Sequence, residues 1–216
     1  MKLSTTGWLL LGWLAASAAT GAAQTRSVSG EAYAAYVNTP FATQDKTPYS
    51  VLPAGTSSDG AIADATGDNL SVARALATET VSSIATGAIS NKAATTQSIA
   101  SAAAVSLLNG LITATHVLAL SSSGSNGGNA YSNSDGSAFE DLVVNGVALG
   151  PDVAPNTRIA LPGVGYVVLN EQSSSGDGVS SSGLTVNMIH VVLTNALTGA
   201  QTGEIIIASA QTAVSF

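Results

Sequence analysis

Two short acidic stretches contain the residues best suited to binding a metal ion. The stretch "DATGDN" begins at Asp64 and includes Asp68, and the stretch "NSDGSAFED" includes Asp135 and ends at Asp141. Both place carboxylate and amide oxygens around a glycine, and oxygen ligands are what Ca²⁺ prefers. Neither stretch matches the EF-hand loop, because no carboxylate falls at its terminal position. We therefore predict no metal site, and these four aspartates remain only as candidates.

The two histidines are the next residues that could do chemistry. His116 and His190 each lie within an apolar stretch. A zinc site would need further ligands from histidine, cysteine or carboxylate, but the chain has 0 cysteines and no HExxH motif. If the two stretches were neighbouring strands, the imidazoles could meet. The pattern favours two partly buried histidines whose ring nitrogens bind backbone groups or hydroxyls.

No catalytic motif is present, so we predict that the protein is not an enzyme and has no catalytic residue, no cofactor and no cofactor-binding residue. The G-x-S-x-G and G-x-G-x-x-G motifs are both missing, and the serines of "GTSSDG" and "SSSGDG" lie in expected flexible loops. Glu140 and Asp141 would point to opposite faces of a strand, and Glu171 is expected at a solvent-exposed strand end. A hydrolase would require His116 or His190 to meet a carboxylate and a hydroxyl.

A binding module for carbohydrate or Ca²⁺ is the main alternative. Tyr131, Asp135, Glu140 and Asp141 of the central Ser/Gly-rich region would form such a site. Three other tyrosines could also stack on a sugar, although their rings are more often buried in a core: Tyr33, Tyr36 and Tyr166.

Composition and the first residues indicate export. Residues 1–23 have Lys2 followed by the apolar run "WLLLGWLAASAA", which is too short to span a bilayer and is typical of a cleaved signal peptide. Residues 24–216 then form a single domain with no transmembrane helix. The chain has 13 acidic and 6 basic residues, and its lysines and arginines are scattered, so nucleic acid is not an expected partner.

Short turns between apolar runs predict an all-β fold, a single antiparallel β-sandwich or β-roll. Asn145-Gly146 and Pro162-Gly163 are strong turn signals, and Asn109-Gly110 is either a turn or a bulge. Residues 184–195 and 203–214 are the last two strands, apolar on both faces as central strands would be. The first strand, at 29–38, should lie beside the last, because ordered termini need a partner strand.

The remaining segments are less regular. Residues 39–69 are expected to be mostly loop, with a short strand at 49–52. Residues 70–106 are rich in alanine, but their alternating aliphatic and threonine positions favour strands over helix, with a turn at Gly87 and "SNK" (90–92). The Ser/Gly tracts at 121–137 and 173–183 are expected to be mobile loops.

Six segments together resemble the choice-of-anchor P family of exported bacterial proteins. They are "SGEAYAAYV", "LLNGLITA", "LVVNGVAL", "PNTRIALPGVGYVVLNEQ", "GLTVNMIHVVLTN" and "GEIIIASA". The resemblance implies an exported protein of unassigned activity; it carries no catalytic residues over. Members carry different C-terminal attachment signals, whereas this chain reaches Phe216 with no LPxTG-like motif and no hydrophobic or basic tail.

These observations predict a non-enzymatic protein with a structural or adhesion-like role, secreted or associated with the cell surface. Its partner would be extracellular or part of the cell envelope. A further alternative is a filament subunit that assembles by strand exchange, with the segment after Gln24 as the donor strand.

Overall fold

The computed structural model describes residues 26–53 and 60–216. The predicted signal peptide at 1–23, the cleavage site before Gln24 and most of the "GTSSDG" stretch lie outside these residues. The regular elements of the described residues are all β-strands, which confirms the all-β prediction. None of these residues forms a helix that could cross a membrane.

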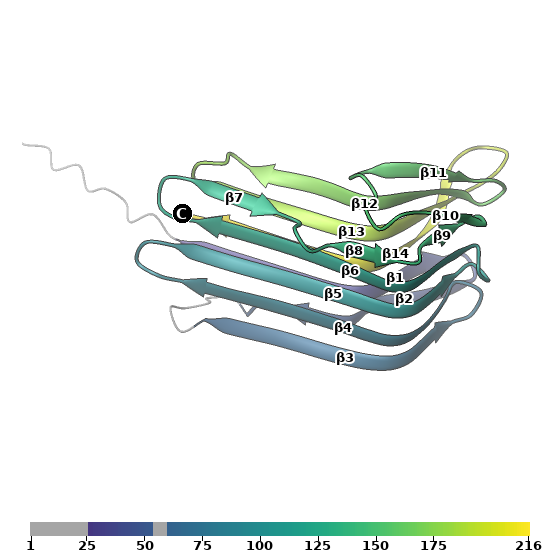
Figure 1. Ribbon diagram of the computed structural model, residues 1–216, viewed down its shortest axis with the longest axis horizontal. Helices are drawn as coiled ribbons and strands as arrows, with labels where there is room; N and C mark the ends of the chain where they lie inside the picture. The colour runs from purple at the N-terminus through teal and green to yellow at the C-terminus, as the bar shows by residue number, and fades with distance from the viewer. Residues whose placement is uncertain (1–25, 54–59) are drawn as a thin grey trace, which may run out of the picture.

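The strands form two antiparallel sheets that pack into a sandwich (Figure 1). Sheet A has the order β11 (Thr157–Leu161), β12 (Gly165–Gly176), β13 (Ser181–Thr194), β14 (Gln201–Ser215), β1 (Ser27–Thr39) and β2 (Ala42–Val51). Sheet B has the order β10 (Val147–Ala148), β9 (Val143–Val144), β6 (Ile112–Ser125), β5 (Ala94–Leu107), β4 (Leu76–Ile89) and β3 (Ala61–Val72). Two more short strands pair with β6: β7 (Ala130–Asn133) and β8 (Ala138–Glu140).

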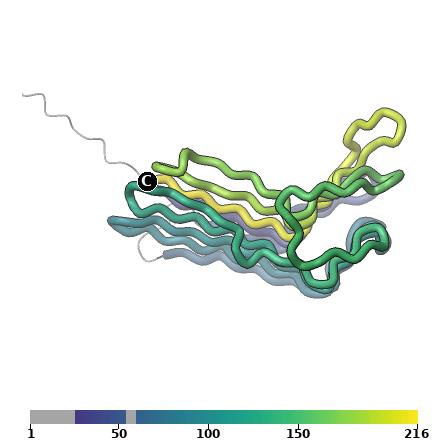
Figure 2. Tube along the Cα trace, turned by 45° about the horizontal axis from the view of Figure 1, so that its top comes forward, coloured from purple at the N-terminus to yellow at the C-terminus, as the bar shows by residue number. Residues whose placement is uncertain are grey.

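The first and last strands are neighbours, as predicted. Ala32 pairs with Ala210 and Val37 with Ile205 along β1 and β14. The turn at 195–200, which joins β13 to β14, projects from one end of the sandwich (Figure 2). Because β1 lies between β14 and β2, the N-terminal strand is an integral part of sheet A.

A crease crosses both sheets where the long strands bend together (Figure 1). At the crease the pairing of β12 with β13 keeps its register but omits one pair, because Asn170 and Met188 lie between the pairs Leu169–Ile189 and Glu171–Asn187. The pairing of β1 with β2 instead shifts register there, between Ala35 and Val37. Left-handed backbone conformations mark this line, and its residues with positive φ are Asn69 (53°), Ala104 (52°), Asp141 (50°), Asn170 (48°) and Ala208 (52°).

The crease reverses which positions of a strand face the interior. In β14, Ile205 and Ile207 are buried on one side of it, and the even-numbered Ala210 and Thr212 are buried on the other. Consecutive apolar residues such as Met188-Ile189 can therefore both lie in the same core. The predicted explanation, strands covered on both faces, is thus only part of the reason for these apolar runs.

The interior also changes character at the crease. One half is filled by large aliphatic and aromatic side chains such as Leu107, Ile189 and Phe139. The other half contains small and hydroxyl-bearing residues; a Cβ added at Gly30 would come within 3.0 Å of side-chain atoms of the opposite sheet. The buried hydroxyl residues of this half are Ser50, Ser83, Thr96, Ser98, Ser121, Ser123, Ser125 and Thr212.

These hydroxyls link the sheets. Thr212 Oγ1 on β14 lies 2.7 Å from Ser121 Oγ and 2.7 Å from Ser123 Oγ on β6. Ser123 Oγ continues to Ser132 Oγ at 2.8 Å, and Ser132 Oγ lies 2.7 Å from Ser182 Oγ. Buried polar groups are stable when they are hydrogen-bonded, and each hydroxyl of this chain from Thr212 to Ser182 has a hydroxyl partner, whereas the buried Ser125 Oγ has no partner among the described residues.

Several segments differ from the sequence-based expectation. Residues 39–69 are not mostly loop, since they contain all of β2 and most of β3. Both are edge strands, which tolerate the proline and acidic residues that suggested a loop. Residues 70–106 form strands as predicted and turn at 90–92, but Gly87 lies inside β4. Asn109-Gly110 forms the turn between β5 and β6.

The two Ser/Gly tracts are largely strand. Residues 121–125 continue β6 with buried serines, and 173–176 continue β12. The turn that remains at 177–180 is ordered by Asp177, whose carboxylate accepts hydrogen bonds from the backbone N–H groups of residues 179, 180 and 181. The Ser180 hydroxyl and these N–H groups hold the pKa of Asp177 well below its usual range. The tracts looked like loops because serine rarely fills a core.

Candidate functional site

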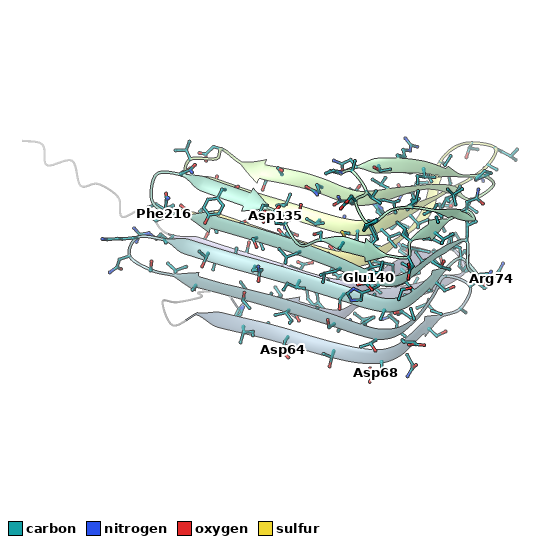
Figure 3. All side chains as sticks on the ribbon, in the orientation of Figure 1. Asp64, Asp68, Arg74, Asp135, Glu140 and Phe216 are labelled. Carbon is teal, nitrogen blue, oxygen red and sulfur yellow. The ribbon has the colours of Figure 1, made fainter. Side chains whose placement is uncertain are left out.

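The four aspartate candidates for a metal site do not meet at one place, and Figure 3 shows Asp135 well apart from Asp64 and Asp68. Asp64 and Asp68 lie on β3, and four residues of strand separate them by about 13 Å, too far to share one ion. Asp135 follows β7, and Asp141 accepts a 2.8 Å hydrogen bond from Thr115. Among residues 26–53 and 60–216, no three histidine or carboxylate side chains are arranged so that they could hold one metal ion.

The two histidines lie in different sheets, so their imidazoles do not meet. His116 is in β6 and pairs with Glu140 of β8. His190 is in β13 and lies between two carboxylates, with Nδ1 2.9 Å from Glu171 Oε2 and Nε2 3.3 Å from Glu204 Oε2. The expected backbone or hydroxyl partners of His190 are therefore wrong, because its neighbouring strands β12 and β14 each place a glutamate within reach.

Charge stabilises this cluster of His190, Glu171 and Glu204. The hydrogen bond to Glu171 raises the pKa of His190, despite partial burial of the ring. The same bond lowers the pKa of Glu171, which also accepts a 2.8 Å hydrogen bond from Asn187 Nδ2. Glu171 is thus not a free solvent-exposed strand end. With both ring nitrogens bound to carboxylates, His190 has no nitrogen left to activate a hydroxyl, and the cluster acts as a link across three strands.

Four of the five basic side chains in the described part of the chain lie over aromatic rings, and Lys92 does not. Lys46 also forms an ion pair with Glu31. The cation–ring distances to the centroids are Arg26–Phe216 4.2 Å, Lys46–Tyr33 4.9 Å, Lys46–Tyr49 5.6 Å, Arg74–Phe41 5.3 Å and Arg158–Tyr166 3.7 Å. Two of the three tyrosines considered for sugar stacking, Tyr33 and Tyr166, therefore already have a cation on the ring. These contacts also explain why the basic residues are scattered.

Tyr131 is different, because its ring is 51% exposed and carries no cation. It borders a trough of about 670 Å³ on sheet B. The strand β7, which carries Tyr131, lies near the end of the sandwich that holds the C-terminus (Figure 1). The lining residues come from β3, β4, β5, β6 and β7, and include Ile62, Thr86, Thr95, Gln97 and Ser122. None of the lining residues within the described ranges is charged. The trough is open, and its lining exposes more apolar than polar surface, with hydroxyl and amide groups between the apolar residues and one aromatic ring at the edge.

Only part of the sequence-predicted binding region reaches this trough. Tyr131 lines it, whereas Glu140 and Asp141 line a separate hollow of about 590 Å³. Asp135 lies in the turn after β7 and lines neither of these hollows. The strand residues Thr86, Thr95 and Gln97 were not predicted, because recognising them requires the pairing of β6 with β7, for which the short "AYSN" segment carries no strong signal.

Comparison with known proteins identifies no relative: no family model, no curated protein and no solved structure matches the chain.

Proposed function

We propose that the chain is an exported, non-enzymatic bacterial protein with a structural or adhesion-like role at the cell envelope. The observation that carries this proposal is the form of the binding surface. The hollow beside Tyr131 is an open trough on sheet B with no charged residue in its described lining, and the histidine that meets carboxylates has both nitrogens engaged. An active site instead needs convergent groups in a preorganised pocket.

The rigid interior supports the same proposal. Hydroxyl-to-hydroxyl contacts join the sheets in one half, and a large aliphatic core joins them in the other. Such a sandwich suits a protein that must stay folded outside the cell without disulfides. The likeness of six segments to the choice-of-anchor P family and the signal-like residues 1–23 support export.

Assembly by strand exchange remains an alternative with one supporting observation. The 12-residue strand β3 forms the edge of sheet B. Asp64 and Asp68 point outward from it, and charged residues on an edge strand oppose pairing with another chain. We therefore favour a monomeric adhesion-like protein. Size-exclusion chromatography separates the two, since a filament subunit would elute as a concentration-dependent series of assemblies.

Export is tested by fractionating cells that express the full chain and sequencing the N-terminus of the recovered protein. We expect protein outside the cytoplasm that begins at Gln24. Recovery of the chain only from the cytoplasm, with Met1 retained, would contradict the proposal.

A further inference from the structure

The trough on sheet B is built from two rows of side chains that cross neighbouring strands. The first row follows the pairs Ala88–Thr95, Thr95–Gly124 and Gly124–Tyr131. The second row follows Ile62–Thr86, Thr86–Gln97 and Gln97–Ser122. The first row holds small residues up to Tyr131, so the aromatic ring is the one large group along it.

The ring of Tyr131 packs against the backbone of Gly124. A Cβ at position 124 would lie 2.6 Å from both Cζ and the hydroxyl oxygen of Tyr131, so the ring rests directly on the glycine backbone. The opposite side of the ring remains exposed. The strand pairing thus presents an aromatic surface, fixed on one side, to whatever enters the trough.

Neutral hydrogen-bonding groups lie in the lining beside apolar residues such as Ile62 and Ala88. Gln97 Nε2 donates to Ser122 Oγ at 3.1 Å, which orients the amide along the second row. Thr86 Oγ1 donates to the backbone oxygen of Gln97 at 3.3 Å, and Thr95 is exposed. Amide and hydroxyl groups can donate and accept, as the hydroxyls of a sugar do. A ring with a polar tip offers an apolar face to the C–H groups of a sugar ring.

We propose that this trough binds a neutral saccharide, with Tyr131 as the stacking platform and Gln97 and Thr95 as hydrogen-bonding groups. The inference rests on the proposed adhesion-like function and names the chemistry of its ligand. A phosphate-bearing ligand does not fit, since no lysine or arginine lines the trough.

The test is binding of the full chain to an array of neutral and acidic oligosaccharides, followed by titration of the strongest neutral oligosaccharide. We expect wild type to bind neutral oligosaccharides, and Tyr131→Ala to weaken the affinity by about tenfold or more, while Tyr131→Phe keeps it within about threefold. Gly124→Ala should also weaken binding, because the new methyl group displaces the ring without removing it.

Two controls isolate the trough from general effects. Gly128→Ala makes the same chemical change where nothing lies within 4 Å, and Tyr49→Ala removes an exposed tyrosine of sheet A. Both variants should bind as wild type does, and the melting temperature of every variant confirms folding.

Three results would overturn the proposal: no binding to any neutral oligosaccharide, a preference for acidic ones, or a Tyr131→Ala variant that binds normally. Retention of wild type and Tyr131→Ala alike on isolated cell envelopes would end the saccharide site but leave the adhesion-like function standing. If neither wild type nor Tyr131→Ala is retained on isolated envelopes, the proposed adhesion-like function itself is refuted.

Discussion

Thr212→Val should test the hydroxyl link between the sheets. Thr212 is 1% exposed, and its Oγ1 contacts Ser121 Oγ and Ser123 Oγ, each at 2.7 Å. Valine keeps the shape and the β-branching but removes both hydrogen bonds. Each neutral hydrogen bond contributes about 0.5–1.5 kcal/mol, and a buried hydroxyl left with fewer partners adds to the cost. Since Ser121 Oγ still donates to Leu184 O and Ser123 Oγ keeps Ser132, we expect a total loss of about 2 kcal/mol.

Thermal unfolding followed by circular dichroism would measure this loss. For a domain of this size about 1 kcal/mol shifts the melting temperature by roughly 2–4 °C, so Thr212→Val should lower it by roughly 4–8 °C. The matched control is Thr95→Val, the same change at an exposed position of the central strand β5, where the effect should stay within about 0.5 kcal/mol. A Thr212→Val variant that melts with wild type or above it would refute the view that these hydroxyls hold the sheets together.

Two further predictions concern the histidine cluster and the crease. The pKa of His190 is raised above 6.5, so its contribution to folding stability is complete below pH 6.5 and is lost as the pH rises through the pKa of the folded state. The pKa of Glu171 is lowered below 4.5, so its contribution to folding stability is complete above pH 4.5 and is lost as the pH falls through the pKa of the folded state. We expect the melting temperature to be highest between pH 4.5 and 6.5 and to decline on the alkaline side. His190→Asn should flatten this decline, and His116→Asn should leave it unchanged. The reverse pattern would refute the stabilising role of the His190 cluster. Ala104 is exposed at φ 52°, a conformation that costs about 1–2 kcal/mol for a non-glycine residue, so Ala104→Gly should leave the free energy of unfolding in urea unchanged or raise it by up to about 1 kcal/mol. Ala100→Gly, buried on the same strand, should lower it by about 1–2 kcal/mol, and equal losses for both would argue against strain at the crease.

The fold class could be predicted from the sequence because turn chemistry is local. A turn with positive φ at both central residues favours Asn-Gly, and Asn145 and Gly146 have φ of 50° and 78° between the paired strands β9 and β10. The Pro162-Gly163 turn likewise joins β11 to β12. The pairing of the first strand with the last followed from the need of ordered termini for a partner.

The strands rich in serine could not be predicted from the same local reasoning. A serine in a strand such as Ser121 carries no apolar signal, and its burial depends on a hydroxyl from β14 that is distant in sequence. The crease is similarly hidden, because alanine at positions 104 and 208 gives no indication of a left-handed conformation. Both features arise from packing between strands rather than from the residues' own preferences.

The candidate site was only partly predictable for the same reason. Tyr131 stood out as a tyrosine in a Ser/Gly-rich region, but its neighbours Gln97 and Thr95 belong to a strand far earlier in the chain. The acidic residues drew attention because charge is rare in this sequence. The structure does not gather Asp64, Asp68 and Asp135 into one site.

The central claim, that this protein attaches to the envelope without chemical turnover, is tested most directly by one measurement. The full chain is incubated with envelopes isolated from the cells that express it, and the envelopes are then sedimented. The fraction of protein that sediments with them is measured as a function of protein concentration. We expect saturable binding that reaches a constant level and releases no soluble fragment of the envelope. Sedimentation no greater than that of an unrelated acidic protein, or a steady release of envelope fragments over time, would contradict the claim.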